Sequence, residues 1–190
     1  MFFADVFDGI GTYPIQGENY KIGASIGWGF GRDEDDDSEN LRGMGDIDTA
    51  VVVNLMGEYS FGPVQISGKV SKGDGDYGTT ASLDIGTMFP VSKQLMVRAS
   101  IGSTWADDDH MQTYFGVSPE QSVRSGYSRY NAKSGIKSVG ISVGAIYNMS
   151  EKWDVMFMLN SDKLLGDAEN SPITKKDIQP TLFLTTSYKF

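Results

Sequence analysis

Apolar and polar residues alternate along most of the chain, and residues 20–30 show the pattern most clearly. One set of positions there is apolar, and the set between them is small or polar: Tyr20, Ile22, Ala24, Ile26, Trp28 and Phe30 against Lys21, Gly23, Ser25, Gly27 and Gly29. A period of two residues is typical of a β-strand, whereas a helix repeats about every 3.6 residues. The segment therefore predicts a strand with one apolar and one polar face.

The same alternation recurs through the rest of the chain. The apolar faces are formed by Val51, Val53, Leu55, Tyr59; Val64, Ile66, Val70; Ala81, Leu83, Ile85, Phe89; Leu95, Val97, Ala99, Ile101, Trp105; Val139, Ile141, Val143, Ala145, Tyr147; Trp153, Val155, Phe157, Leu159; and Leu182, Leu184, Tyr188, Phe190. The opposite faces carry Asp48, Asn54, Glu58, Gln65, Lys69, Asp84, Arg98, Ser142, Gly144, Asp154, Asn160, Thr181, Thr185, Ser187 and Lys189. With residues 2–10 as a first strand of ambiguous facing, the pattern predicts nine strands.

Alternation alone does not separate a soluble β-sandwich from a membrane barrel, but the residue types on the two faces do. Aromatic residues stand at strand ends on the apolar face, where interfacial girdles lie: Tyr20, Trp28, Phe30, Tyr59, Phe89, Trp105, Tyr147, Trp153, Tyr188 and Phe190. The polar face is rich in Gly and Ser with scattered charges, which suits a wet lumen better than a dry core. The sequence therefore predicts an all-β fold, an antiparallel transmembrane β-barrel.

Connection length also alternates, as it does in outer-membrane barrels with short periplasmic turns and long outer loops. Short links rich in turn residues are predicted at residues 13–17, 60–63, 90–93 and 148–151. Long polar links are predicted at residues 31–47, 71–78, 106–134 and 166–179. If the closing strand descends to Phe190 at the periplasm, residues 2–10 descend as well, and an even-numbered barrel needs at least one strand before them. We therefore expect residues 1–190 to be one barrel domain that lacks its signal peptide and first strand or strands, with ten to twelve strands in the full protein.

Composition narrows the partners. The chain of 190 residues has no Cys and a formal net charge of −9, with 16 Lys and Arg against 25 Asp and Glu. The absence of Cys excludes thiolate metal sites and cysteine nucleophiles, and the acidic balance argues against nucleic acid as a partner. We expect no catalytic, cofactor-binding or metal-binding residues, no cofactor, and contact with outer-membrane lipid and lipopolysaccharide.

The acidic segment at residues 31–48 resembles a calcium loop only in composition. It lacks the central Gly spacing and the terminal bidentate Glu of an EF-hand, so we interpret it as a solvated loop. A divalent ion that bridges this loop to lipopolysaccharide phosphates is the alternative.

Two further motifs have a chemical and a structural interpretation. Asp107, Asp108 and Asp109 precede His110, the only His, and a carboxylate beside a His could orient a general base. No nucleophile pattern surrounds them, and a rim enzyme would need a Ser or Asp within hydrogen-bond reach of His110. The glycines of residues 73–78 resemble a phosphate-binding loop, but no helix follows, so we predict a hairpin loop.

The longest link contains a helix signature. Ser118 is a suitable N-cap, Pro119 suits the first helical position, and Gly126 provides a stop, so one or two helical turns are predicted between them. The loop either folds inward as a plug, packs on the barrel rim, or packs on itself.

The same link carries a resemblance to a known family. Residues 113–118, 125–127, Tyr130 and 135–137 resemble the signature of the MipA/OmpV family of outer-membrane proteins. Residues 32–47, 164–168, 171–173 and 187–190 are similar to that family as well, so the resemblance spans nearly the whole chain.

The resemblance implies a non-catalytic role. MipA-like members are scaffolds that tether a murein lytic transglycosylase to a bifunctional penicillin-binding protein, and OmpV-like members are linked to osmotic or antibiotic response and adhesion. The matching residues are loop and girdle positions, so no catalytic residue is carried over. The alternative from the residues themselves is a narrow pore lined by Lys21, Lys69, Arg98, Asp48, Glu58, Asp84 and Asp154, whose mixed charges could equally pair into a plug of salt bridges.

Overall fold

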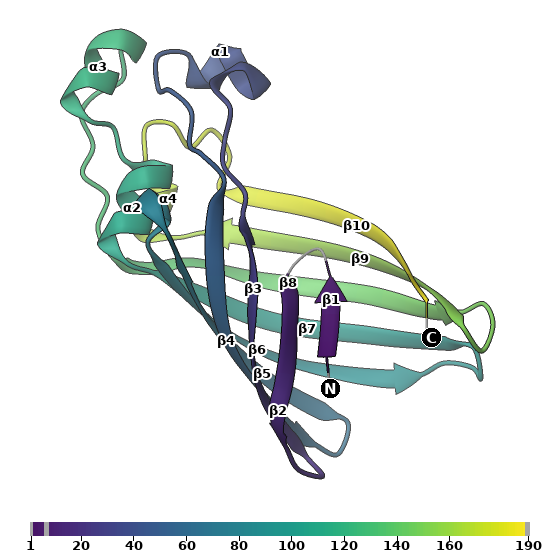
Figure 1. Cartoon of the computed structure of the whole chain (residues 1–190). Coiled ribbons are helices and arrows are strands. Elements are labelled where there is room, and N and C mark those ends of the chain that lie inside the picture. Colours follow the sequence, from purple (N-terminus) through teal and green to yellow (C-terminus); the bar gives the residue numbers. More distant parts are fainter. Residues whose placement is uncertain (1, 6–7, 189–190) are drawn as a thin grey trace.

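A single antiparallel sheet forms the body of the protein. The computed structural model describes residues 2–5 and 8–188. Its ten strands lie in sequence order, each hydrogen-bonded to the next, and the sheet curls into a half-barrel (Figure 1). The strands are β1 (Phe2–Asp5), β2 (Gly9–Gln16), β3 (Tyr20–Gly29), β4 (Ala50–Phe61), β5 (Val64–Gly73), β6 (Thr79–Pro90), β7 (Leu95–Ala106), β8 (Gly135–Asn148), β9 (Trp153–Leu164) and β10 (Ile178–Tyr188).

The predicted facing of the strands is confirmed. Along β3 and the first half of β4, apolar residues such as Ile26 and Val53 are exposed, while the residues between them, Ser25 and Asn54, are buried. Because successive side chains of a strand point to opposite sides, one sheet surface is continuously apolar, and the other carries mainly small and polar side chains with Val52 and Met56 among them. The apolar surface is the convex one, since a curled sheet shields the side chains on its concave side.

Aromatic side chains mark both edges of the apolar surface. Near the short turns, Tyr20 pairs with Tyr59 across β3 and β4, and the rings of Trp153 and Tyr188 lie 5.0 Å apart across β9 and β10. Trp28 on β3 and Trp105 on β7 lie at the other edge, where these strands meet the long loops. Tyr20 and Trp28 are eight residue steps apart, about 26 Å along the strand. A segment of this length falls at the lower end of the roughly 9 to 11 residues with which a tilted β-strand crosses a bilayer.

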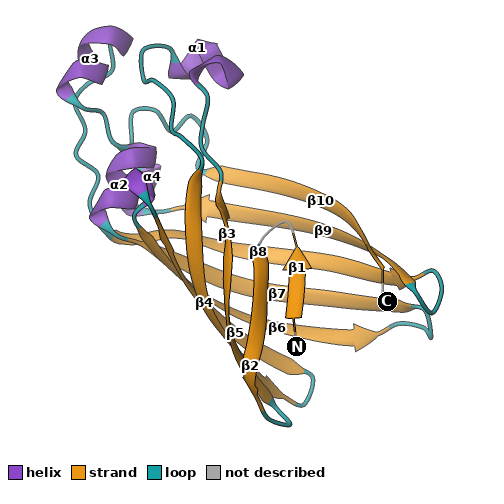
Figure 2. Ribbon diagram, in the orientation of Figure 1, coloured by secondary structure: helices purple, strands orange, loops and turns teal. Residues whose placement is uncertain are grey.

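Short turns lie at one end of the sheet and all helices at the other (Figure 2). The turns are residues 17–19, 62–63, 91–94 and 149–152. The long loops contain the short helices η1 (Glu34–Asp37), α1 (Ser38–Leu41), η2 (Gly75–Tyr77), α2 (Asp108–Phe115), α3 (Pro119–Ser125) and α4 (Gly166–Glu169). No helix in the described part of the chain is long and apolar enough to cross a membrane.

The N-terminal segment differs from the prediction. Residues 2–10 do not form one strand, because β1 ends at Asp5 and β2 begins at Gly9, where φ is +77°. The first short turn is also shifted: Tyr13 to Gln16 belong to β2, whose register with β3 slips between Thr12 and Ile15. The sheet therefore has ten strands where the pattern indicated nine. The predicted end of the last strand, Phe190, lies outside the described residues.

Two clusters of buried hydrophobic residues lie in the loops and at the strand ends next to them. One cluster joins Ala106, Met111, Ala132, Leu164 and Ala168, with Phe115 and Tyr130 packed against it. A second joins Met44, Val117 and Ile173, with Tyr127 and Tyr130 against it. Because these residues come from three long loops and from the ends of β7 and β9, the loops form one packed unit, which we call the cap.

Candidate functional site

Helix α3 confirms the prediction made for the longest loop. The Ser118 hydroxyl accepts a hydrogen bond from Gln121 N at 3.2 Å, and Ser118 N donates to Gln121 Oε1 at 2.8 Å, which completes a capping box. The helix ends at Gly126 with φ +79°, a conformation that favours glycine. Gln121 Nε2 also donates to Met44 O at 2.7 Å, so this residue of the first turn of α3 ties its loop to the one between β3 and β4.

Helix α2 was not predicted, although its N-cap residue, Asp107, could have been recognised in the sequence. Asp107 accepts a hydrogen bond from His110 N at 2.9 Å, so the acidic run is the first turn of a helix. Burial alone would raise the pKa of Asp107, but hydrogen bonds from Thr79 and His110 outweigh it and lower the pKa. Asp108 accepts from Ser134 N at 2.6 Å, and that bond lowers the pKa of Asp108. Two of the three aspartates therefore have structural partners.

His110 is buried inside the cap, at 4% exposure. Its Nδ1 lies 2.8 Å from Tyr77 O, and because a carbonyl can only accept, Nδ1 carries the proton. Its Nε2 then accepts from Lys137 Nζ at 3.3 Å. Burial, and next the charge of Lys137, lower the pKa of His110 to about 4. Among residues 2–5 and 8–188, neither ring nitrogen bonds a serine hydroxyl or a carboxylate, so the general-base pair that the motif suggested does not form.

Hydrogen bonds between loops hold the rest of the cap together. Tyr127 OH donates to Asn40 O at 2.9 Å, and Ser171 Oγ donates to Phe115 O at 2.6 Å. Tyr130 OH donates to Asp167 O at 3.1 Å. The long loop that contains α2 and α3 therefore packs on the rim against its neighbours, which decides between the three arrangements considered for it.

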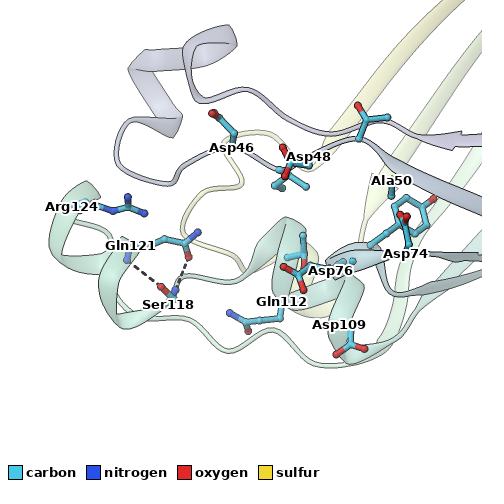
Figure 3. Close-up of a pocket in the computed structure, with 15 residues that line it drawn as sticks. Asp46, Asp48, Ala50, Asp74, Asp76, Asp109, Gln112, Ser118, Gln121 and Arg124 are labelled. Atoms are coloured by element: carbon cyan, nitrogen blue, oxygen red, sulfur yellow. Dashed lines mark hydrogen bonds between the residues drawn. The ribbon is translucent and has the colours of Figure 1, made fainter.

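An acidic vestibule of about 770 Å³ lies between the loops of the cap, the top of β4 and the loop between β5 and β6. Figure 3 shows its carboxylates, which come from three loops, with Arg124 at one side. Its acidic residues are Asp46, Asp48, Asp74, Asp76 and Asp109. Two of them are engaged by the backbone: Asp46 accepts from Glu34 N and Asp74 from Val51 N, each at 2.8 Å. The five carboxylates together give the mouth of the sheet a field that attracts cations.

The acidic loop at residues 31–48 is exposed at residues 35–39, as expected of a solvated loop, and it also has local hydrogen bonds. Asp33 caps η1 by accepting from Asp35 N at 2.9 Å, and Glu34 accepts from Gly45 N at 2.7 Å. Backbone hydrogen bonds from Gly43 and Gly45 lower the pKa of Glu34. In the part of the chain that the structure describes, no three His, Asp or Glu side chains gather in a way that could hold a metal ion.

The concave face carries the predicted lumen residues, with one correction. Asp48 precedes β4 and lines the vestibule, because that strand begins only at Ala50. Lys21 pairs with Glu58 at 2.9 Å, and Lys69 pairs with Asp8 at 2.8 Å. These two pairs support the salt-bridge interpretation for the side of the sheet formed by β2 to β5.

A buried polar ladder lies beside these ion pairs. Asn54 Nδ2 donates to Ser25 Oγ at 3.0 Å, and Ser71 Oγ donates to Asn54 Oδ1 at 2.6 Å. All three side chains are buried, and each hydrogen bond spans neighbouring strands. This half of the concave face is therefore a satisfied polar network.

The other half of the concave face is open. Asp84 and Arg98 line a cavity of about 290 Å³ together with Ser100, Asn160 and Asp162. Asp162 was not singled out from the sequence, because only the register of β6 to β9 brings it into line with Asp84. Asp154 is buried, on the polar side of β9 next to the turn at residues 149–152.

An apolar convex face, a polar concave face, short turns at one end and long packed loops at the other define a protein of the β-barrel class. Comparison with known proteins is more specific. The chain belongs to the MipA family, because the family model described as "MltA-interacting protein MipA" matches residues 1–190.

Two curated relatives are similar to part of the chain. The MltA-interacting proteins of Escherichia coli (strain K12) and Shigella flexneri are each 29% identical to it over 96 residues. The match covers 50% of this chain and 38% of each relative. The MipA/OmpV resemblance seen in the sequence is thereby confirmed.

Proposed function

We propose that this chain is an outer-membrane β-barrel without catalytic activity that acts as a scaffold for a murein lytic transglycosylase. The observation that carries the membrane placement is the exposed apolar face between two rows of aromatic residues, which would be unfavourable in water over so large an area. The names of the relatives support the choice of partner. A penicillin-binding protein is the second partner, on the strength of the family resemblance.

A non-catalytic role agrees with the chemistry of the cap. His110, the residue best suited to general-base catalysis, is held by Tyr77 and Lys137 inside the cap. A His that is buried and has a pKa of about 4 cannot accept a proton efficiently near neutral pH. Its position is explained by packing instead.

The turn end is the surface that a periplasmic partner would meet. Apolar side chains are exposed there, among them Phe61 at the end of β4 and Val91 and Met149 in the turns. A stable interface buries about 800 Å² on each partner, which turns of this size supply only jointly. We therefore expect contact with several turns at once, so that single substitutions weaken binding and combined ones remove it.

Retention on an immobilised murein lytic transglycosylase tests the scaffold role. The refolded chain in detergent micelles is expected to be retained, and the double variant Val91→Ser with Met149→Ser to be retained at least about tenfold less, since clustered apolar contacts dominate interface energies. Val123→Ser is the matched control, because Val123 is equally apolar, 84% exposed and in the cap. No retention of the parent chain, or a loss confined to Val123→Ser, would contradict the proposal.

A narrow pore is the second candidate function, and the open half of the concave face favours it. The cavity beside Asp84 and Arg98 leaves polar space that a fully paired plug would fill. Conductance steps in a planar bilayer that change with Arg98→Gln would support a pore. A silent bilayer would exclude it for this chain.

A further inference from the structure

Two carboxylates on the concave face lie in one row of the sheet. Asp84 on β6 is opposite Gly102 on β7, Gly102 is opposite Gly140 on β8, and Gly140 is opposite Asp162 on β9. Antiparallel partners point to the same side of the sheet, so all four positions face the lumen. The two acids therefore flank a pair of glycines.

Both carboxylates lean over the neighbouring glycine, toward each other. A Cβ atom at Gly102 would overlap Oδ1 of Asp84, and a Cβ atom at Gly140 would overlap Oδ1 of Asp162. Strands lie about 4.8 Å apart, so the two Cα atoms are three spacings apart and the carboxylates are separated by about one spacing. A side chain at either glycine would abolish this arrangement.

The row forms one wall of a polar cavity that also contains a positive charge. Arg98 lies on the same side of β7, and Ser100, Ser142 and Asn160 supply hydroxyl and amide groups. Within the described residues, the side chains of Asp84, Arg98 and Asp162 make no hydrogen bond or salt bridge, although Asp84 interacts with the charges of Arg98 and Asp162. Lys69 also acts on Asp84, and Lys137 interacts with Asp162, but Lys69 is paired with Asp8 and Lys137 Nζ contacts His110.

We propose that this cavity binds an amino acid with a cationic side chain. Two carboxylates and one guanidinium give the site a formal charge of −1, and such an amino acid presents two cationic groups and one carboxylate, a charge of +1. The ligand amines face Asp84 and Asp162, and its carboxylate faces Arg98, the residue whose planar fork suits carboxylates. The volume of about 290 Å³ is at the lower end for small-molecule sites, about 300 Å³, which suits a solute of this size.

Substitution of the two glycines distinguishes a specific binding site from a general attraction of cations to an acidic lumen. Gly102→Ala and Gly140→Ala keep every charge but displace the carboxylates from the gap. Asp76→Asn removes one negative charge from the vestibule and leaves the row intact, so it is the matched charge control. The proposal is independent of the scaffold role, because it concerns the lumen and not the turn end.

Isothermal titration of the refolded chain in detergent micelles with L-lysine tests the proposal. Binding is expected, with a loss of at least about tenfold for Asp84→Asn, Asp162→Asn and Gly102→Ala, since each removes or moves a charged hydrogen-bonding group. Asp76→Asn is expected to bind as the parent does. L-glutamate and Nε-acetyl-L-lysine are expected to bind more weakly, because each lacks one of the three complementary charges.

Three outcomes would overturn the site. They are no heat of binding for L-lysine with the parent chain, equal binding of L-glutamate, and unchanged affinity in both aspartate variants. Far-ultraviolet circular dichroism of each variant confirms that the strands are retained, and a second aspartate variant is available if one fails to fold.

Discussion

Lys137 Nζ lies 3.3 Å from Nε2 of His110, so the only His of the chain is held neutral beside a cation in the cap. Burial, reinforced by this charge, lowers the pKa of His110 from 6.5 to about 4. In the unfolded cap the same ring would titrate near its ordinary value. Between these two values the unfolded state binds more protons than the folded state.

The stability of the cap is therefore expected to fall as pH is lowered. A depressed pKa contributes stability that is complete above about pH 6.5 and is lost as pH falls through about 4, with an upper value of about 3 kcal/mol. Hydrogen exchange of the amides of α2 at several pH values measures it. The variant His110→Gln lacks this titration, so its cap stability is expected to depend less on pH. The same pH dependence in both proteins would contradict the contribution of His110.

Met111 holds the larger cap cluster together. Its side chain is 1% exposed, and Met111→Ala is expected to destabilise the cap by about 2 to 5 kcal/mol, the range for buried large-to-small changes. Limited proteolysis of the loop at residues 107–134 measures the loss, while the strand signal in circular dichroism is retained. Val123→Ala, at an 84% exposed position, is the control and is expected to behave as the parent. Equal protease resistance of the Met111 variant would count against a packed cap.

Loss of the capping box of α3 is expected to destabilise the cap less than the Met111 substitution does. Ser118→Ala removes the acceptor for Gln121 N and is expected to cost about 1 kcal/mol. Gln121→Ala keeps that hydrogen bond but removes the one from Ser118 N and the one to Met44 O, so it is expected to increase exchange in the loop between β3 and β4 as well. Exchange rates of both loops in both variants separate the local effect from the link between loops. If the two variants give the same pattern, the link contributes nothing.

The convex face is expected to tolerate no charge near its middle. Leu182 on β10 is 62% exposed and faces outward, so Leu182→Arg places a charge in lipid and is expected to cost about 2 to 4 kcal/mol. Thr181, its neighbour, faces the lumen, and Thr181→Arg is the matched control with a much smaller expected cost. Urea titration of the refolded proteins in lipid vesicles measures the free energy of unfolding. Similar losses for both variants would contradict the assigned facing.

The strands and their facing could be predicted because a two-residue period is local in sequence. Ile26 and Ser25 show their sides of the sheet without any knowledge of the neighbouring strands. Helix α3 could be predicted for the same reason, since Ser118, Pro119 and Gly126 signal its ends within a few residues. The N-terminal strands were harder to predict. The break between β1 and β2 and the register slip after Thr12 depend on how these strands pair with their neighbours.

The candidate sites could be predicted only in part, because they depend on contacts between residues that are distant in the sequence. Asp107 looked like a partner for the His110 ring, but its carboxylate caps the backbone of the same helix. Asp84 was recognised as a lumen residue, whereas its alignment with Asp162 required the registers of three strand pairs. Lys137 belongs to the family signature, but its contact with His110 could not be predicted, because it joins the start of β8 to a helix in the preceding loop.

Labelling of introduced cysteines tests the membrane placement most directly, because the chain contains no Cys. Asp35→Cys lies in the cap and Glu18→Cys in the first short turn, and both positions are exposed. With a membrane-impermeant maleimide, the cap cysteine is expected to react in intact cells and the turn cysteine only after the outer membrane is permeabilised. Reaction of both cysteines in intact cells, or of neither, would contradict a barrel that spans the outer membrane with its cap outside.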